Sequence, residues 1–386
     1  MVRPPARGDH RGGALRLLSS GADFTYGNTR LRVRKAGLLH RSDYEALLGK
    51  DVDGILGALA STPYGPEVEA AITRQRGARR VHEAVRRHFA RALEEMRSFY
   101  DGSARELVDL LLSRWDLHNA LTLLRGVATR SDPEETPAYV FPMGSLNDAL
   151  VREVARQSEL AAAVQLLVRW QLPDWDTART LRRAWPEYER TEDFAALEHR
   201  VTAGWARRTS DALESLRPGS EALQRLFGRE IAERNLLTAL RLREALARGE
   251  IERLPQPGDL EVYLPGGAVR PESLDEAIRR PDAAGVAAAL AEAGPGAWQE
   301  PLERWGQDQN LAGLQHELET RRLRDATALF LRGDQLGIDL PVAYAAAKQI
   351  EAHNLRLLAE GAARNLSPER VRKRMILPES GEAGAE

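Results

Sequence analysis

Residues 114–125 read Arg-Trp-Asp-Leu-His-Asn-Ala-Leu-Thr-Leu-Leu-Arg, and the chain contains two further versions of this stretch. The second, at 230–241, reads Glu-Ile-Ala-Glu-Arg-Asn-Leu-Leu-Thr-Ala-Leu-Arg. The third, at 349–359, reads Gln-Ile-Glu-Ala-His-Asn-Leu-Arg-Leu-Leu-Ala. The three versions share an asparagine, at Asn119, Asn235 and Asn354. These asparagines are 116 and 119 residues apart, so the sequence predicts an internal repeat.

A second marker keeps the same period. The stretch Val-His-Glu-Ala-Val at 81–85 recurs as Leu-Glu-His-Arg-Val at 197–201 and as Leu-Gln-His-Glu-Leu at 314–318. Solenoid repeats have periods of roughly 20–50 residues, whereas a period near 117 is the size of a whole small domain. The sequence therefore predicts three copies of one domain, and three copies favour a pseudo-threefold ring or funnel over a rod.

The composition favours an all-α fold. The 386 residues are 43% apolar, which is enough for three cores of ordinary size, and only 6% are aromatic. Leu, Ala, Arg and Glu dominate, and runs of β-branched residues are scarce. Each copy is expected to hold two short helices, a long helix, a Gly/Pro break and a second long helix with the asparagine. In the first copy the long helices are expected at about 70–99 and 104–126, so the domains are predicted to be helical bundles.

Pro- and Gly-rich connecting segments mark the predicted domain boundaries. Phe-Pro-Met-Gly at 141–144 and Leu-Pro-Gly-Gly at 264–267 each follow a short apolar, extended step and precede a new helix. The predicted organisation is a flexible N-terminal extension (1–21), three helical repeat domains (22–137, 138–262 and 263–377) and a tail (378–386).

Charge and cysteine content exclude several classes of protein. The net charge is −2, so no overall basic field points to nucleic acid. The chain has no cysteine, which excludes disulfides and removes the usual ligands of zinc sites. Residues 1–21 lack the apolar core of a signal peptide, and no run of 18 apolar residues predicts a membrane span. Any connection to a membrane is therefore expected to pass through a protein partner or a surface contact.

No motif predicts catalysis, a cofactor or a metal ion. Gly49-Lys50 is followed by Asp51 and lacks the upstream glycine of a phosphate-binding loop. His82-Glu83 comes nearest to a zinc-protease motif, but Arg86 stands where the second histidine is needed. No Gly-x-Ser-x-Gly turn is present. We therefore expect no catalytic, cofactor-binding or metal-binding residues, and an enzyme with its own active site is the least favoured interpretation.

The repeated asparagine lies within an apolar stripe. Four residues before it stand Trp115, Ile231 and Ile350, and positions four apart share a helix face. A buried carboxamide is costly unless its donor and acceptor groups are paired. Two interpretations are open: the side chain hydrogen-bonds backbone groups of a neighbouring element, or it lines a central opening and touches a partner. The first is favoured, which makes the three asparagines structural residues of the repeat core.

Several segments of the chain resemble one protein family. They are residues 26–34, which read Tyr-Gly-Asn-Thr-Arg-Leu-Arg-Val-Arg, Gly-Leu-Leu at 37–39, Thr-Pro-Tyr-Gly at 62–65, 112–121, the two connecting segments and the closing helix at 344–358. In order and recurrence these segments resemble the C subunit of the bacterial and archaeal V/A-type rotary ATPases, the counterpart of the d subunit in the eukaryotic V-type enzymes. The resemblance runs from about residue 23 to residue 377.

The resemblance implies a non-catalytic subunit of the central stalk. It implies a funnel whose narrow face binds the membrane proteolipid ring and whose opening receives the tip of the central shaft, so that ion transport is coupled to ATP synthesis or hydrolysis. It also implies a peripheral location on the cytoplasmic face of the membrane, through the ATPase complex. The alternative is a free-standing all-helical adaptor that binds protein clients in a central cavity.

A protein that couples a ring to a shaft needs contacts that hold under load and still separate on disassembly. Polar, charge-rich contacts suit that requirement, since charged rims set orientation and association rate. The candidates for partner binding are basic residues at the starts of domains, namely Arg30, Arg32, Arg34, Lys35, Arg41, Arg152 and Arg270.

Overall fold

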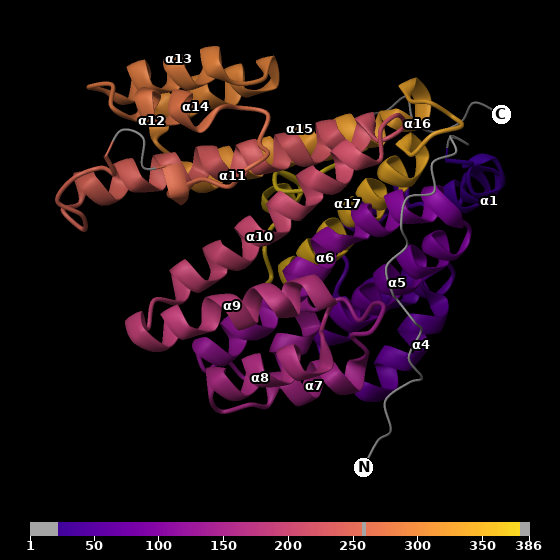
Figure 1. Cartoon of the computed structure of the whole chain (residues 1–386). Helices are drawn as coiled ribbons and strands as arrows, with labels where there is room; N and C mark the ends of the chain where they lie inside the picture. Colours follow the sequence, from indigo (N-terminus) through magenta and orange to yellow (C-terminus); the bar gives the residue numbers. More distant parts are fainter. Residues whose placement is uncertain (1–21, 257–259, 379–386) are drawn as a thin grey trace.

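The structure is a computed structural model that describes residues 22–256 and 260–378. Within these ranges the regular structure is α-helical, with three short 3-10 helices and no strand (Figure 1). The predicted all-α fold class is confirmed. The predicted N-terminal extension at 1–21 and nearly all of the predicted tail lie outside the described residues.

In chain order the helices are described in three sets, each of which ends in a long helix that carries one of the three asparagines. After α1 (Thr25–Lys35), the first set is α2 (Arg41–Leu47), α3 (Val52–Ala60), α4 (Gly65–Arg74), α5 (Arg79–Ser98) and α6 (Gly102–Ala128). The second set is α7 (Asp148–Ala155), α8 (Leu160–Trp170), α9 (Trp175–Thr191), α10 (Phe194–Ser215) and α11 (Glu221–Ala247). The third set is α12 (Pro271–Ile278), α13 (Ala283–Ala293), α14 (Gln299–Asp308), α15 (Leu311–Thr327), α16 (Leu329–Arg332) and α17 (Asp339–Ala363). The last helix is α18 (Pro368–Arg372), and the 3-10 helices are η1 (Thr136–Tyr139), η2 (Leu260–Val262) and η3 (Gly296–Trp298).

The expectation of one helix over 70–99 is wrong. Helix α4 ends at Arg74 and α5 begins at Arg79, because Gln75 is extended (φ −128°, ψ 170°) and Gly77 has φ 55°. Glycine adopts this left-handed conformation with little strain, so Gly77 permits the change of direction. In the first set three helices therefore precede the long helix α5, where the sequence predicted two. Three helices also precede α10 in the second set and α15 in the third.

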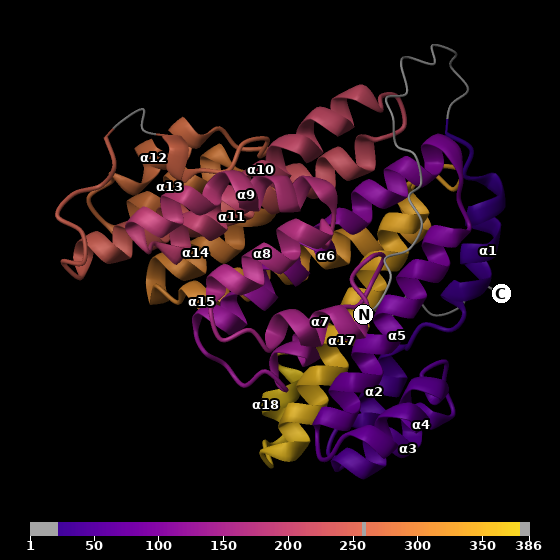
Figure 2. The same ribbon diagram turned by 60° about the horizontal axis from the view of Figure 1, so that its bottom comes forward.

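The long helices form the frame of the molecule (Figures 1 and 2). Helix α5 packs on α6, α10 on α11, and α15 on α17. Helices of different sets also pack together: α6 on α10, α11 on α15, and α17 on α5. The last long helix therefore returns to the first set. The domain boundaries near 137 and 262 remain a prediction. Helices pack across both positions, because α6 packs on α7 and α11 packs on α12.

Two apolar cores hold this frame. The larger runs through the first two sets and α17, and includes Phe89, Trp115 and Phe227. The second joins α11 to α12–α15 around Trp298 and Trp305. Burial of each large apolar side chain contributes roughly 1.5–3 kcal/mol. No helix in the described ranges is long and apolar enough to cross a membrane.

Candidate functional site

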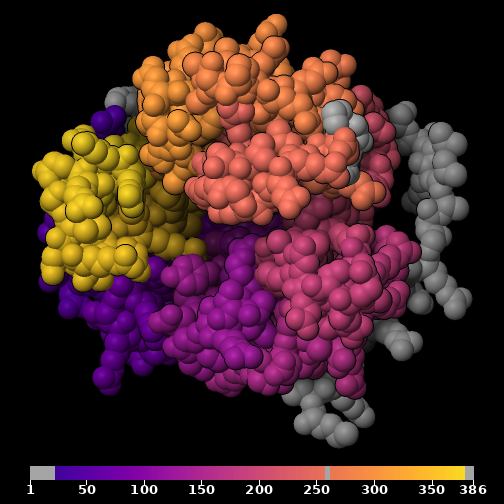
Figure 3. Space-filling model, turned by 90° about the vertical axis from the view of Figure 1, so that its left-hand side faces the viewer, coloured from indigo at the N-terminus to yellow at the C-terminus, as the bar shows by residue number. Residues whose placement is uncertain are grey.

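A central cavity of about 1300 Å³ lies between α5, α6, α10, α11, α15 and α17. Figure 3 shows a hollow between the yellow, orange and purple parts of the chain. The three asparagine-bearing helices line the cavity with equivalent positions, which lie five and one residues before the asparagine and two, three and six residues after it. They are Arg114, His118, Leu121, Thr122 and Arg125 in α6, Glu230, Arg234, Leu237, Thr238 and Arg241 in α11, and Gln349, His353, Arg356, Leu357 and Glu360 in α17. This spacing places one face of each helix on the cavity.

The three asparagines do not line the cavity. Asn119, Asn235 and Asn354 are at most 1% exposed. In each, the side-chain Nδ2 donates to the carbonyl oxygen of a later residue, and the N–H of that same residue donates to the asparagine Oδ1. The pairs are Asn119 with Phe141 (2.6 and 2.8 Å), Asn235 with Leu264 (2.9 and 2.7 Å), and Asn354 with Ile376 (2.8 and 2.9 Å). Each asparagine therefore ties a long helix to the extended segment that follows it.

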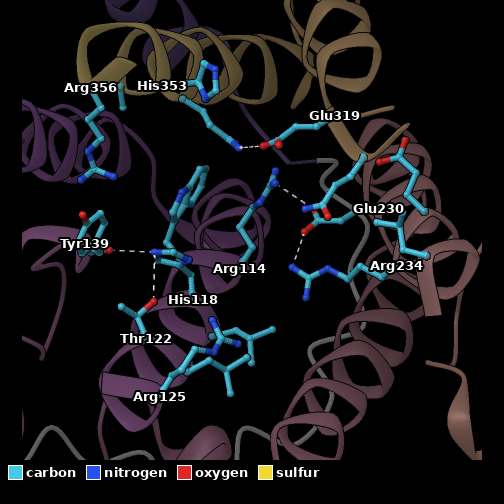
Figure 4. Close-up of a pocket in the computed structure, with 18 of the residues that line it drawn as sticks. Arg114, His118, Thr122, Arg125, Tyr139, Glu230, Arg234, Glu319, His353 and Arg356 are labelled. Carbon is cyan, nitrogen blue, oxygen red and sulfur yellow. Dashed lines mark hydrogen bonds and ion pairs between the residues drawn. The ribbon is translucent and has the colours of Figure 1, made fainter. Parts of the chain in front are cut away.

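A group of largely buried ion pairs lies in the cavity wall. Glu230 contacts Arg114 and Arg234 at 3.0 Å each and Arg322 at 3.3 Å, and Arg322 also pairs with Glu233 at 2.8 Å. Burial would raise the pKa of Glu230, but the three guanidinium groups lower it to about 2. Glu230 is therefore ionised at neutral pH. We call these five residues the floor cluster, and it joins α6, α11 and α15 (Figure 4).

Beside the floor cluster the wall carries an imidazole and a guanidinium from different helices (Figure 4). The His118 Nε2 lies 3.0 Å from the carbonyl oxygen of Tyr139, and Arg356 donates to the carbonyl oxygen of Ala138 at 3.0 Å. Burial lowers the pKa of His118 below its ordinary value, and also lowers the pKa of Arg356 to about 10. At neutral pH, Arg356 is thus cationic, while His118 is neutral and donates from Nε2.

Charged side chains surround the outer part of the cavity, and we call them the rim. The rim consists of four exposed arginines and two half-buried glutamates, namely Arg125, Arg241, Arg364, Arg374, Glu198 and Glu360. Arg125 pairs with Glu198 at 2.6 Å, and Arg364 pairs with Glu360 at 3.0 Å. In the described parts of the chain, no three His, Cys, Asp or Glu side chains are placed to hold a metal ion. The cavity could therefore bind a partner through its shape and its charged side chains, several of which are held in place by ion pairs with one another.

A comparison with known protein families shows to which family the chain belongs. The family model described as "ATP synthase (C/AC39) subunit" matches residues 27–374. The chain belongs to this family. The resemblance inferred from the sequence motifs is confirmed.

Relatives within the C/AC39 family match along nearly their whole length. The chain is 30% identical to the C subunit of the V-type ATP synthase of Thermus thermophilus over 363 residues, which covers 92% of this chain and 99% of the relative. It is 25% identical to the C subunit of the A-type ATP synthase of Halorubrum lacusprofundi over 356 residues, which covers 90% and 96%. It is 24% identical to the A-type protein of the same name from Haloferax volcanii, with coverage of 93% and 99%.

The basic residues predicted to bind partners do not lie in the cavity of this C/AC39 protein. Four are on α1, where Arg34 pairs with Glu95, Arg32 lies 3.4 Å from the carbonyl oxygen of Gln335, and Arg30 and Lys35 lie over the rings of Phe99 and Phe330 at 4.8 and 4.7 Å. Lys35 and Arg41 line a second pocket of about 450 Å³ between the α1–α2 loop and α15–α17.

The other two predicted residues are distant from this group. Arg152 is exposed on α7, and Arg270 is exposed immediately before α12. Helices α1, α7 and α12 lie in different parts of the molecule in both views (Figures 1 and 2). The structure therefore gathers the cluster at 30–41 but does not bring Arg152 or Arg270 to it.

Sequence reasoning missed the cavity-lining residues of the C/AC39 chain. A signal for them was available, because the residue before each asparagine is polar in all three copies, as His118, Arg234 and His353. Those side chains point to one shared space only because α6, α11 and α17 meet around it, and that arrangement is a property of the tertiary fold.

Proposed function

We propose that this chain is a non-catalytic central-stalk subunit of a V/A-type rotary ATPase or ATP synthase. In this role it connects the membrane proteolipid ring to the central shaft, so that ion transport and ATP synthesis or hydrolysis are coupled. The proposal carries over the names of the relatives, which are C subunits of A-type and V-type ATP synthases. The structural observation that supports it is the central cavity with equivalent lining positions on three long helices.

The proposed architecture is a funnel of three similar helical domains at 22–137, 138–262 and 263–377. The shaft tip occupies the cavity, and the opposite, narrow face binds the ring. A socket that transmits torque has to keep its shape under sideways load. The floor cluster supports this requirement, because Glu230 is held by Arg114, Arg234 and Arg322 from three helices. The protein itself is proposed to bind no nucleotide, and to be held at the cytoplasmic face of the membrane through the complex.

Affinity purification from native membranes tests the proposed function. The full chain, tagged at one end and expressed in its own organism, is captured after mild detergent extraction. We expect the proteolipid ring and the shaft subunits to be recovered with it, and we expect ATP-driven ion transport to be lost when the gene is deleted and restored by the tagged chain. Recovery of protein clients without the ring would overturn the proposal in favour of a free-standing adaptor.

A further inference from the structure

The charges that line the central cavity are unequal. Eight arginines line it, namely Arg114, Arg125, Arg234, Arg241, Arg322, Arg356, Arg364 and Arg374. Five glutamates line it, namely Glu198, Glu230, Glu233, Glu319 and Glu360. No lysine or aspartate is among the lining residues, so the wall carries an excess of three cations when its histidines are neutral.

The excess is not in the floor cluster. The side chains of Arg114, Arg322, Glu230 and Glu233 are at most 10% exposed and are paired with one another. Together with Arg234 and the neighbouring Glu319, they form a balanced set of three cations and three anions. A buried charge that is already paired has little to offer a partner, because a new contact would have to replace an existing one.

Two of the three excess cations are at the rim, where the exposed Arg125, Arg241, Arg364 and Arg374 face only Glu198 and Glu360. The third is the half-buried Arg356, which donates to the carbonyl oxygen of Ala138. Arg241 has one weak contact, at 3.4 Å to Gln315. The rim guanidinium groups come from α6, α11, the end of α17 and the segment after α18, so they surround the opening. Exposed cations on several sides of an opening attract an anionic partner and orient it.

The cavity is large enough for one helix. Arg114 and Arg125, like Glu230 and Arg241, are eleven residues apart, which at 1.5 Å per residue separates floor from rim by about 16 Å. A volume of about 1300 Å³ over that depth corresponds to a cross-section of about 80 Å², which is enough to admit an α-helix about 10 Å in diameter.

We infer that the cavity takes a single helical end of the shaft, about three turns long, whose carboxylates face the arginine rim. The inference rests on the proposed function and adds the chemistry of the contact. Carboxylates at the rim find exposed guanidinium groups, which bind them in bidentate fashion, whereas the paired floor accepts a neutral tip. Such a contact forms quickly, is oriented by charge, and weakens as salt rises.

A charge-neutralising variant of the rim tests the inference. The variant combines Arg241→Gln, Arg364→Gln and Arg374→Gln. The three arginines are exposed and lie outside the floor cluster. The matched control combines Arg182→Gln, Arg183→Gln and Arg190→Gln on the outer helix α9, which removes the same charge away from the cavity. Binding of the full chain to the purified shaft subunits is measured by calorimetry at about 0.05 M and 0.5 M salt. We expect the rim variant to bind roughly tenfold more weakly at low salt, with little difference at high salt, and the control to match the wild type.

A second probe separates this inference from the proposed function. Poly-L-glutamate of about 15 residues is expected to bind the wild type and the control, and to bind the rim variant more weakly, whereas poly-L-lysine is not expected to bind. If the wild type does not bind the shaft, the proposed function fails, and the polyglutamate series still tests the rim. Equal affinity of the wild type and the rim variant for both shaft and polyglutamate would overturn the inference. Inorganic polyphosphate is the last probe. If it bound more tightly than the shaft, and if that binding was lost in the rim variant, the inference that the occupant is a protein would be overturned.

Discussion

Asn354 and Ile376 exchange two hydrogen bonds across 22 residues of chain. The Asn354 Nδ2 donates to the Ile376 carbonyl oxygen at 2.8 Å, and the Ile376 N–H donates to the Asn354 Oδ1 at 2.9 Å. Asn119 and Phe141 make the same pair of bonds across 22 residues, and Asn235 and Leu264 make it across 29. The side-chain amide therefore acts like the backbone of a neighbouring strand and satisfies both polar groups of one extended residue.

This pairing explains why an amide is present in three apolar stripes. The backbone groups of Phe141, Leu264 and Ile376 are buried where no helix or strand supplies partners. An alanine or leucine in place of the asparagine would leave one buried N–H and one buried carbonyl unpaired, and we expect this loss of hydrogen bonding to cost roughly 1–3 kcal/mol in all. Asparagine supplies one donor and one acceptor in the required geometry.

Replacement of Asn235 by alanine is expected to destabilise the protein. The loss should be roughly 1–3 kcal/mol, because the Leu264 backbone loses both partners. Chemical unfolding measures it. Shaft binding by the folded fraction should be kept, because Asn235 does not line the cavity. Unchanged stability with lost shaft binding would instead make the asparagine a contact residue. Ser215→Ala, on the neighbouring helix α10, is the control, since the exposed Ser215 hydroxyl bonds the carbonyl of Ala212 one turn earlier and does not line the cavity.

Glu230→Gln is expected to change the dependence of stability on pH. The pKa of Glu230 is about 2 in the folded protein, below the ordinary value of 4.5. The stability that its ionisation contributes is therefore present above pH 4.5 and lost as pH falls toward 2. The variant should be less stable at pH 7 by roughly 3 kcal/mol, because three guanidinium groups lose their carboxylate. It should also lose less stability than the wild type between pH 4.5 and 2, as followed by urea unfolding.

The control for Glu230 is a glutamate in an exposed pair. Glu134 pairs with Arg156 at 2.9 Å, and the side chain of Glu134 is 62% exposed. Glu134→Gln should change stability by less than about 1 kcal/mol and leave the acid profile unaltered. If Glu230→Gln has the same acid profile as the wild type, the floor cluster does not hold Glu230 ionised.

The helical fold was predictable because its signals are local. The apolar stripes and the Gly/Pro breaks are readable over short windows and predict the long helices, while the period near 117 comes from comparing such windows along the chain. The break at Gly77 was missed because one glycine in a helical pattern does not show whether the backbone there is left-handed. The three asparagines were readable as buried, but their partners were not, because Phe141 and Leu264 are 22 and 29 residues away along the chain.

The return of α17 to the first set was not predictable from the sequence. Glu351 on α17 accepts hydrogen bonds from the Leu39 N–H at 2.6 Å and the Tyr64 hydroxyl at 2.7 Å, across 312 and 287 residues. Nearby, Lys348 lies 3.1 Å from the His88 Nε2. No local pattern records contacts at such separations. The cavity depends on them, so its lining could not be assigned before the tertiary fold was known.

Two glycines in helices are expected to respond to alanine with opposite signs. Alanine favours a helix over glycine by about 1 kcal/mol. At Gly57, inside α3, an added Cβ would meet no atom within 4 Å, so Gly57→Ala should stabilise the protein. At Gly27, inside α1, the Cβ would lie 2.1 Å from the ring of Tyr100, whose hydroxyl is fixed by Asn28 at 2.7 Å. Gly27→Ala should therefore destabilise by roughly 1–3 kcal/mol, as measured by thermal unfolding. Stabilisation at both sites would show that α1 is not packed on Tyr100.

Neutralising the cations of α1 is expected to weaken assembly with the proteolipid ring. Arg30, Arg32 and Arg34 lie on α1, outside the central cavity, and all three are exposed. Arg30 contacts the exposed Tyr26 and the ring of Phe99, while Arg32 and Arg34 contact the half-buried Gln335 and Glu95. Such surface contacts contribute roughly 0.2–1 kcal/mol each, so the combined glutamine variant should keep its helicity by circular dichroism and its affinity for the shaft. Assembly with the ring should weaken most at low salt, since salt screens exposed charges beyond about 10 Å at 0.1 M.

The α9 variant with Arg182→Gln, Arg183→Gln and Arg190→Gln is again the control, because it removes three charges from a different surface. Detergent-solubilised ring, titrated with each full-length variant and followed by co-sedimentation, measures the assembly. A difference between the α1 and α9 variants that disappears at high salt assigns the cations at 30–34 to the ring contact. Ring assembly equal to that of the wild type at every salt concentration would remove these cations from the interface. Loss of shaft binding instead would place α1 at the shaft contact and contradict its separation from the cavity.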